Sequence, residues 1–172
     1  LGDVYKRQEA DAIFLGAIGL PTVRKKDGTE IAPHLRFREK FNLYAGLRPV
    51  KAYRNTPQRL SEKNAEKIDF VVLRECTEGL FYTAAVHNRN KIANNDEVED
   101  IMRITRNTTT RLHNFAFKLA EKRKQKGKLG KVTCVDKANV FKSQALFRKI
   151  FNEIKDDFPN IEADTCYVDA MA

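Results

Sequence analysis

The chain has 172 residues, of which 42% are hydrophobic, and its 32 Lys and Arg against 23 Asp and Glu give a formal net charge of +9. This hydrophobic fraction can build the core of a domain, which excludes a chain that is disordered by composition. The longest apolar stretches are far shorter than the roughly 20 residues that a membrane span needs, so we predict no membrane association. Three cysteines fit poorly with a secreted disulfide framework and favour a cytoplasmic protein.

The first half of the chain alternates apolar runs with turn-forming residues. Uninterrupted apolar runs such as DAIFLGAIG and DFVVLR are typical of buried strands. Proline is tolerated in the first turn of a helix, so Pro33 indicates a helix start, whereas Pro49 indicates an edge or irregular strand. In chain order we expect a buried strand at 11–19, a turn at 25–29, a helix at 33–42, an extended segment at 45–53 and a strand at 69–74.

The second half contains the clearest helical pattern in the chain. Asp96 and Glu99 have the spacing of a capping box, and apolar residues recur at helical spacing until Gly127 and Gly130. We therefore expect a helix from Asp96 to these glycines, a strand at 132–136, a helix capped by Ser143 and buried through Leu146, Ile150 and Ile154, and a strand at 162–168. Strands and helices alternate throughout, which predicts the α/β class.

The positive charge is concentrated between Arg103 and Lys131, where ten Lys or Arg residues accompany one acid, Glu121. A basic face could bind the phosphates of a nucleic acid. It could also be a solvated helix end whose cations complement the helix dipole. No aromatic residue follows Phe117 in this stretch to stack on bases, so we favour the helix end and predict no nucleic-acid partner.

A set of charged side chains falls at the ends of the predicted elements, where α/β proteins place their sites. Arg38, Arg48 and Arg74 could each face solvent or pair with a local acid, but together they could bind carboxylates bidentately. Lys137 follows a strand and could act as an acid or base if it is desolvated. Asp169, just past the last strand, is a reasonable ligand for a hard metal ion. These residues suggest an enzyme that binds a polycarboxylate with help from a metal ion.

Other short motifs do not narrow the reaction. The sequence contains no GxGxxG, P-loop, HExxH or GxSxG pattern. His34, His87 and His113 are isolated from one another in the sequence, and we interpret each as an ordinary surface or half-buried histidine rather than a ligand.

The same charged residues lie in stretches that resemble the β-decarboxylating hydroxyacid dehydrogenases, the family of isopropylmalate, isocitrate, homoisocitrate and tartrate/D-malate dehydrogenases. The phrases LYAGLRPVK and VDKANV are specific to this family, and their order and spacing agree with it. The resemblance covers residues 9–172 and implies an isopropylmalate-dehydrogenase-like two-domain α/β fold. The matching stretches are DAIFLGAIG (11–19), FREKFNLYAGLRPVK (37–51), DFVVLRECTEGLF (69–81), KVTCVDKANVF (131–141) and YVDAMA (167–172).

The resemblance also implies an internal fragment, truncated at both ends. Residues 1–8 match nothing in the family and are interpreted as non-native or unassigned. Residues 9–43 are expected to be the tail of the first, cofactor-side domain, and 44–172 an incomplete, dimer-forming second domain. Residues 83–95 fall where the family extends an arm to its partner, so a homodimer with a shared site is expected. Further metal ligands and the loop for the adenosine half of NAD are expected after Ala172, so we expect the fragment alone to be inactive.

Position by position, the resemblance implies a site and a mechanism. Arg38, Arg48 and Arg74 match the arginines that hold the malate carboxylates. Lys137 matches the lysine that acts, through the partner subunit, as acid/base on the substrate hydroxyl, and Asp169 matches the first acidic ligand of Mg²⁺ or Mn²⁺. The implied reaction is oxidation of a 2-hydroxy acid by hydride transfer to NAD. Carbon dioxide is then lost while the metal ion polarises the new carbonyl.

Three further positions carry less direct implications. Asn139 falls where the family has an asparagine near the nicotinamide. After RECTEG the family commonly has a tyrosine that protonates the enolate, but Phe81 stands there in this chain. Tyr82 is adjacent, although on an extended segment its side chain would point the opposite way. Protonation therefore needs a local register shift or another donor, and Phe81 also leaves open a catalytically inactive, regulatory member of the family.

In isopropylmalate dehydrogenases, the apolar patch that accepts the isopropyl group precedes the first of these arginines. In this chain the patch is His34 and Leu35, with Val140 expected nearby. Leu35 and Val140 suit an alkyl group, whereas His34 suits a polar one. The resemblance therefore favours 3-isopropylmalate, followed by tartrate or D-malate. Isocitrate is less favoured because no clear serine–asparagine pair is found at this patch.

Overall fold

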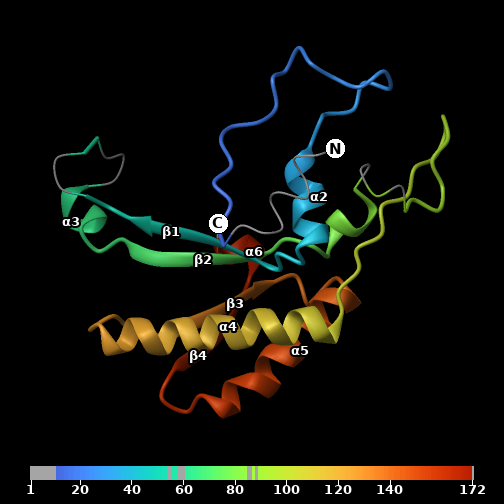
Figure 1. Ribbon diagram of the computed structural model, residues 1–172. Coiled ribbons are helices and arrows are strands. Elements are labelled where there is room, and N and C mark those ends of the chain that lie inside the picture. Colours follow the sequence, from blue (N-terminus) through green and yellow to red (C-terminus); the bar gives the residue numbers. More distant parts are fainter. Residues whose placement is uncertain (1–10, 54–55, 58–60, 85–86, 88, 172) are drawn as a thin grey trace.

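The computed structural model describes residues 11–53, 56–57, 61–84, 87 and 89–171. The predicted non-native segment 1–8 and part of the predicted dimer arm lie outside the described residues. The combination of helices and strands confirms the α/β class (Figure 1). The elements are α2 (Pro33–Lys40), β1 (Ala45–Lys51), α3 (Glu62–Ala65), β2 (Asp69–Glu75), the 3-10 helix η1 (Leu80–Thr83), α4 (Arg106–Gln125), β3 (Lys131–Asp136), α5 (Lys142–Ile154), the 3-10 helix η2 (Lys155–Asp157), β4 (Glu162–Tyr167) and α6 (Val168–Met171).

The strands form two separate pairs, one antiparallel and one parallel. Figure 1 shows the pair β1–β2 above the pair β3–β4. β1 and β2 are antiparallel, with Gly46 opposite Arg74 and Arg48 opposite Val72. Side chains two residues apart on a strand share a face, so this register puts Arg48 and Arg74 on the same face. β3 and β4 are parallel, and Asp136 lies opposite Tyr167 at their carboxyl ends. Helix α4 contacts both β2 and β3 and therefore connects the two pairs.

The main core lies between α4, α5 and the β3–β4 pair. Phe117 on α4 is fully buried, and its ring stacks on Phe151 of α5 and on Phe158, at centroid distances of 5.3 and 5.0 Å. Ile150 and Ile154 are buried in the same cluster, which confirms the predicted inner face of this helix. α5 begins at Lys142 with Phe141 before it, so the prediction that Ser143 caps the helix is wrong.

The apolar run at 11–19 does not form the predicted strand. No strand includes these residues, and the Phe14 side chain is completely exposed. A strand is stable only when a neighbouring strand satisfies its backbone hydrogen-bonding groups. Within the described part of the chain, no segment pairs with 11–19. The apolar pattern alone does not make a strand, and the contacts that would bury this run are not among the described residues.

Helix α4 begins at Arg106, ten residues later than the predicted capping box. The side chain of Asn94 instead accepts hydrogen bonds from the backbone N–H groups of Asp96 and Glu97, both at 2.8 Å, which closes a local turn. The helix start is stabilised from a distant segment, because the Glu78 carboxylate accepts the Thr105 N–H at 2.8 Å. The predicted helix end is confirmed: α4 ends at Gln125, and Gly127 follows with a φ of 76°.

Much of the basic stretch is occupied by contacts within the chain. Arg123 and Lys128 both pair with Asp69, at 2.7 and 2.6 Å, and hold the end of α4 against β2. The hydrogen bonds from Lys128 and Arg123 lower the pKa of Asp69 to about 2. Lys131 pairs with Asp164 and Glu162 across the β3–β4 ladder, which raises its pKa. These contacts favour the structural interpretation of the cluster over a nucleic-acid interface. None of the helices among the described residues is long and apolar enough to cross a membrane.

His113 on α4 is buried against the rings of Phe147 and Phe151, at centroid distances of 4.5 and 5.4 Å. Neither ring nitrogen has a hydrogen-bond partner among the described residues, and burial lowers the pKa of His113 from 6.5 to about 4. The unfolded chain therefore binds a proton between pH 6.5 and 4 that the folded chain does not bind. We expect unfolding free energy to fall by up to about 3 kcal/mol as the pH drops through this range and to level off below it.

The measurement is denaturant unfolding of the full-length protein as a function of pH, with His113→Phe as the comparison. The substitution removes the titrating group but keeps an aromatic ring at the helix contact. The unfolding free energy of the wild-type protein minus that of His113→Phe should therefore decrease by up to about 3 kcal/mol as the pH falls from 6.5 to 4. A difference that is constant over this range would contradict a neutral, desolvated His113.

Candidate functional site

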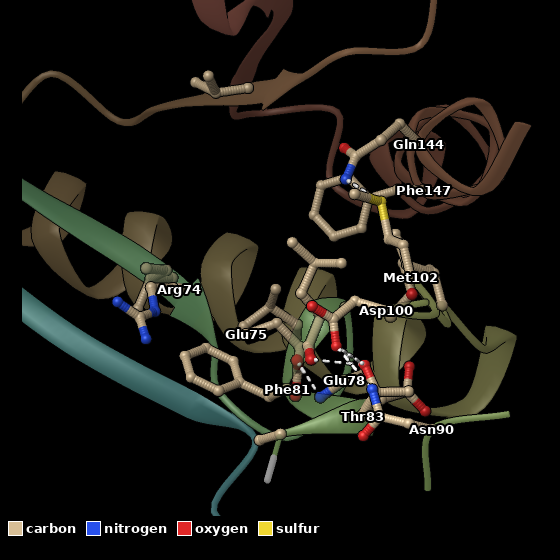
Figure 2. A pocket seen from close by; sticks show the side chains of 18 of the residues that line it. Arg74, Glu75, Glu78, Phe81, Thr83, Asn90, Asp100, Met102, Gln144 and Phe147 are labelled. Carbon is tan, nitrogen blue, oxygen red and sulfur yellow. Dashed lines mark hydrogen bonds between the residues drawn. The ribbon is translucent and has the colours of Figure 1, made fainter. Parts of the chain in front are cut away.

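Two of the three predicted carboxylate-binding arginines meet at one aromatic ring. The guanidinium carbon of Arg38 lies 5.6 Å from the centroid of the Phe81 ring, and that of Arg74 lies 5.0 Å from it. Figure 2 shows Arg74 beside Phe81. The three residues come from α2, β2 and η1, so this contact joins α2 to two elements that follow it much later in the sequence. A ring face attracts a cation without neutralising it, so both guanidinium groups keep their charge for an anionic ligand.

Arg48 lies on β1, on the same sheet face as Arg74. Its Nη1 donates a hydrogen bond to the Leu47 carbonyl at 3.3 Å and lies 3.3 Å from where a Cβ on Gly46 would be. Gly46 is the register partner of Arg74, so the Arg48 side chain folds back in the direction of that arginine. A Cβ on Gly46 would also lie 2.6 Å from the Cys76 Sγ, which explains why a glycine is needed there. We refer to Arg38, Arg48 and Arg74 as the arginine cluster.

Phe81 and Tyr82 are on a 3-10 helix rather than on the extended segment that we expected. Gly79, with a φ of 67°, turns the chain directly before η1 and ends the extended backbone. The two rings nevertheless have different partners. Phe81 contacts the arginine cluster, whereas the Tyr82 ring lies 5.0 Å from the guanidinium of Arg89 and 4.9 Å from that of Arg103. The structure thus shows no register shift that would put the Tyr82 hydroxyl in place of the Phe81 ring.

Lys137 and Asp169 form an ion pair with each other. Lys137 directly follows β3 and Asp169 is in α6 directly after β4, so the parallel pairing of these strands brings both to the same edge. The hydrogen bond from Lys137 is the main reason why the pKa of Asp169 is lowered. In the described part of the chain, no hydrogen bond or ion pair joins these two residues to the arginine cluster.

Asp169 alone does not make a divalent metal site. The described residues contain no group of three or more His, Cys, Asp or Glu side chains that could hold a metal ion. Mg²⁺ and Mn²⁺ prefer several oxygen ligands, and a cation at Asp169 would have to displace the Lys137 ammonium group from it. The residues present therefore supply at most one ligand of the predicted set.

A buried ion pair supports the loop that carries Lys137, and no pattern in the sequence indicates this pair. The Asp136 side chain is completely buried, and Arg148 of α5 binds it bidentately through Nε and Nη2, both at 2.8 Å. Asp136 also accepts the N–H of Ala138 at 2.8 Å, and the Arg148 guanidinium lies over the Tyr167 ring. The pairing raises the pKa of Arg148. Asp136 precedes Lys137 in the sequence, but no local pattern indicates its partner on the following helix.

The remaining predicted site residues differ in their exposure to solvent. Asn139 is exposed in the turn that follows β3. His34 and Leu35 are half-buried in the first turn of α2, and the Val140 side chain is 58% exposed. The predicted substrate-selecting patch is therefore drawn from two elements, α2 and the turn after β3.

A cavity of about 840 Å³ lies next to the arginine cluster, and Arg74 and Phe81 are among its lining residues (Figure 2). Its lining comes from β2, η1, the segment between η1 and α4, and from α4, β3 and α5, and it is mainly apolar. Three polar residues of the lining are linked to one another. The Asp100 carboxylate accepts hydrogen bonds from the Thr83 hydroxyl at 3.2 Å and from the Asn90 amide at 3.0 Å. The volume is within the range of small-molecule sites, roughly 300–1,000 Å³. No sequence pattern indicated this cavity, because its residues are scattered over the chain.

Comparison with known proteins places these features in a family. The family model for isocitrate/isopropylmalate dehydrogenase matches residues 3–172. The 3-isopropylmalate dehydrogenase of Bacillus cereus is 35% identical over 166 residues, which are 95% of this chain and 43% of that protein. Its counterpart in Thermotoga maritima is 36% identical over 170 residues, with 95% and 45% covered. The crystal structure of isocitrate dehydrogenase from Methylococcus capsulatus matches with a TM-score of 0.70 and 31% identity, over 88% of this chain and 42% of that one.

The chain thus spans less than half the length of these relatives. The match is continuous over nearly all of this chain, and it includes every residue of the arginine cluster as well as Lys137 and Asp169. The chain therefore belongs to the isocitrate/isopropylmalate dehydrogenase family.

Proposed function

We propose that the protein to which this chain belongs oxidises and decarboxylates a malate-type 2-hydroxy acid with NAD, and that 3-isopropylmalate is its substrate. The observation that carries the proposal is the convergence of Arg38 and Arg74 on Phe81, with Arg48 on the same face as Arg74. Planar guanidinium groups bind carboxylates bidentately and stay charged at all relevant pH values. Three of them in one cluster, with Arg74 also lining the adjacent cavity, suit a substrate with two carboxylates.

Lys137 and the arginine cluster have separate roles in this reaction. The arginines bind and orient the two carboxylates, and Lys137 accepts the proton of the substrate hydroxyl. NAD, when bound, would supply the acceptor for the hydride on the carbon that bears this hydroxyl. The buried Asp136–Arg148 pair holds the loop that carries Lys137. A divalent ion, when bound, would polarise the new carbonyl, with Asp169 as one ligand and the others from outside the described residues. We place Asn139 near the nicotinamide.

We further propose that the active form is a cytoplasmic homodimer in which Lys137 and Asp169 serve the arginine cluster of the partner. Within the described chain, no hydrogen bond or ion pair joins Lys137 or Asp169 to the arginine cluster, and this separation supports the arrangement. In the same proposal, residues 9–43 belong to the first domain and 44–172 to the second, and part of 83–95 contributes to the contact between subunits.

The test is an assay of the full-length protein with NAD, Mg²⁺ or Mn²⁺, and each of 3-isopropylmalate, tartrate, D-malate and isocitrate. We expect NADH formation with the highest kcat/KM for 3-isopropylmalate. Lys137→Ala should lower kcat by about 10²–10⁴-fold, because it removes the general acid/base, and should change the KM for the hydroxyacid much less. Lys142→Ala, which removes a nearby lysine from the start of α5, is the control and should retain activity.

A catalytically inactive, regulatory member of the family is the second candidate. Phe81 favours it, because the ring that faces the arginine cluster has no hydroxyl group that could donate a proton. Inactivity of the full-length dimer on all four hydroxyacids would support this candidate and contradict the enzyme. Activity that falls with Lys137→Ala would exclude it.

A further inference from the structure

Glu39, which follows Arg38 on α2, contacts the segment beyond η1 with both of its carboxylate oxygens. Oε2 lies 2.6 Å from Nδ1 of His87, and Oε1 pairs with Nη2 of Arg89. The His87 side chain is only 7% exposed, so one side of this contact is shielded from water. Glu39 therefore connects α2 with a segment about 50 residues further along the chain.

Arg89 continues this connection to η1. Its Nη1 donates a hydrogen bond to the Tyr82 carbonyl at 3.4 Å, and its guanidinium carbon lies 5.0 Å from the Tyr82 ring. Arg103 contacts the same ring at 4.9 Å. Tyr82, which lacks contact with the arginine cluster, thus has a different role: its ring and carbonyl bind the guanidinium group that Glu39 holds.

α2 is consequently joined to η1 at two successive residues. Phe81 contacts Arg38 directly, and Tyr82 contacts Glu39 through Arg89. None of the α2 side chains is fully buried. Apolar packing therefore fixes the position of this helix only weakly, and its polar contacts matter more than they would for a helix in a core. The spacing between Arg38 on α2 and Arg74 on β2 depends on how α2 lies against η1.

We propose that Glu39 is a positioning residue of the arginine cluster. Through His87 and Arg89 it holds α2 against η1, and so sets Arg38 at the spacing from Arg74 that a dicarboxylate substrate requires. This inference rests on the proposed function, because it assigns the arginine cluster to substrate binding.

The test uses Glu39→Gln in the full-length protein, which keeps the size of the side chain and removes its charge. We expect the KM for the hydroxyacid to rise about three- to fivefold, the upper part of the range that the loss of a partly exposed ion pair allows. The kcat and the KM for NAD should change less than twofold, because the distance between Arg38 and Arg74 affects the binding of the hydroxyacid rather than the chemical step or the binding of NAD. Glu30→Gln is the matched control: Glu30 pairs with Arg24 at 3.3 Å, is about as exposed as Glu39, and does not contact η1. It should leave all three constants unchanged.

A double-mutant cycle with Arg38→Lys separates positioning from general stabilisation. If Glu39 acts through Arg38, Glu39→Gln should raise the KM less than twofold once Arg38 is replaced. An equal rise in both backgrounds, or an unchanged KM for Glu39→Gln in an otherwise active enzyme, would overturn the proposal while leaving the proposed function intact.

If the protein shows no turnover, the readout is the rise in Tm that 3-isopropylmalate produces in the full-length protein. A smaller rise for Glu39→Gln than for Glu30→Gln supports the positioning role, and an equal rise overturns it. No rise for the unmodified protein contradicts the substrate site itself, and both proposals then fail together.

Discussion

Replacement of Asp136 by Asn is expected to lower the free energy of unfolding by about 3–5 kcal/mol, because it leaves the Arg148 guanidinium without its carboxylate. The Asp136 side chain is completely buried and accepts two hydrogen bonds from Arg148 and one from the backbone of Ala138. An amide can accept at one oxygen only, so its NH₂ group would face an arginine N–H donor. Denaturant unfolding of the full-length protein, monitored by circular dichroism, measures the change.

Glu153→Gln is the matched control for this experiment. Glu153 also pairs with an arginine, Arg106, but the two side chains are 42% and 55% exposed. Exposed pairs of this kind contribute roughly 0–1 kcal/mol. If Asp136→Asn and Glu153→Gln lowered the free energy of unfolding equally, the burial of Asp136 would add nothing to the strength of its ion pair.

Phe117→Ala is expected to destabilise the protein by about 3–5 kcal/mol, the range for removing a large ring from a packed core. The Phe117 side chain has no exposed surface, and it stacks on Phe151 and Phe158. The substitution removes both stacking contacts and leaves a cavity between α4 and α5 that the surrounding helices can fill only in part. The free energy of unfolding and the Tm of the full-length protein should both fall.

Two comparisons sharpen this experiment. Phe117→Leu keeps most of the side-chain volume and should cause a smaller loss than the alanine variant. Leu129→Ala removes an apolar side chain that is 79% exposed and should change stability by no more than about 0.5 kcal/mol. A loss for Phe117→Ala as small as that for Leu129→Ala would contradict the position of this ring in the core.

Sequence patterns predicted the elements whose structure depends on their own residues. The run DFVVLR forms β2, Pro33 begins α2, and Ile150 and Ile154 form the inner face of α5. Predictions failed where a distant residue decides the outcome. The start of α4 depends on Glu78, which is 27 residues away from Thr105, and the run at 11–19 has no pairing segment among the described residues.

The same distinction applies to the candidate site. The resemblance could indicate Arg38, Arg74, Lys137 and Asp169, because each lies in a family-specific stretch. It could not indicate that the Phe81 ring would contact two guanidinium groups, since that contact depends on the turn at Gly79. The ion pair of Lys137 with Asp169 arises from the parallel pairing of β3 and β4, which no local pattern encodes.

The antiparallel register of β1 and β2 places a parity constraint on the lengths of both strands. Arg48 and Arg74 share a face only because Gly46 and Arg48 lie opposite Arg74 and Val72. Inserting one residue between Gly46 and Arg48, or deleting Leu47, would turn Arg48 to the opposite face, while an insertion of two residues would restore its direction. In related sequences, length changes within these strands should therefore occur in even numbers, whereas segments outside the ladder are free of this rule.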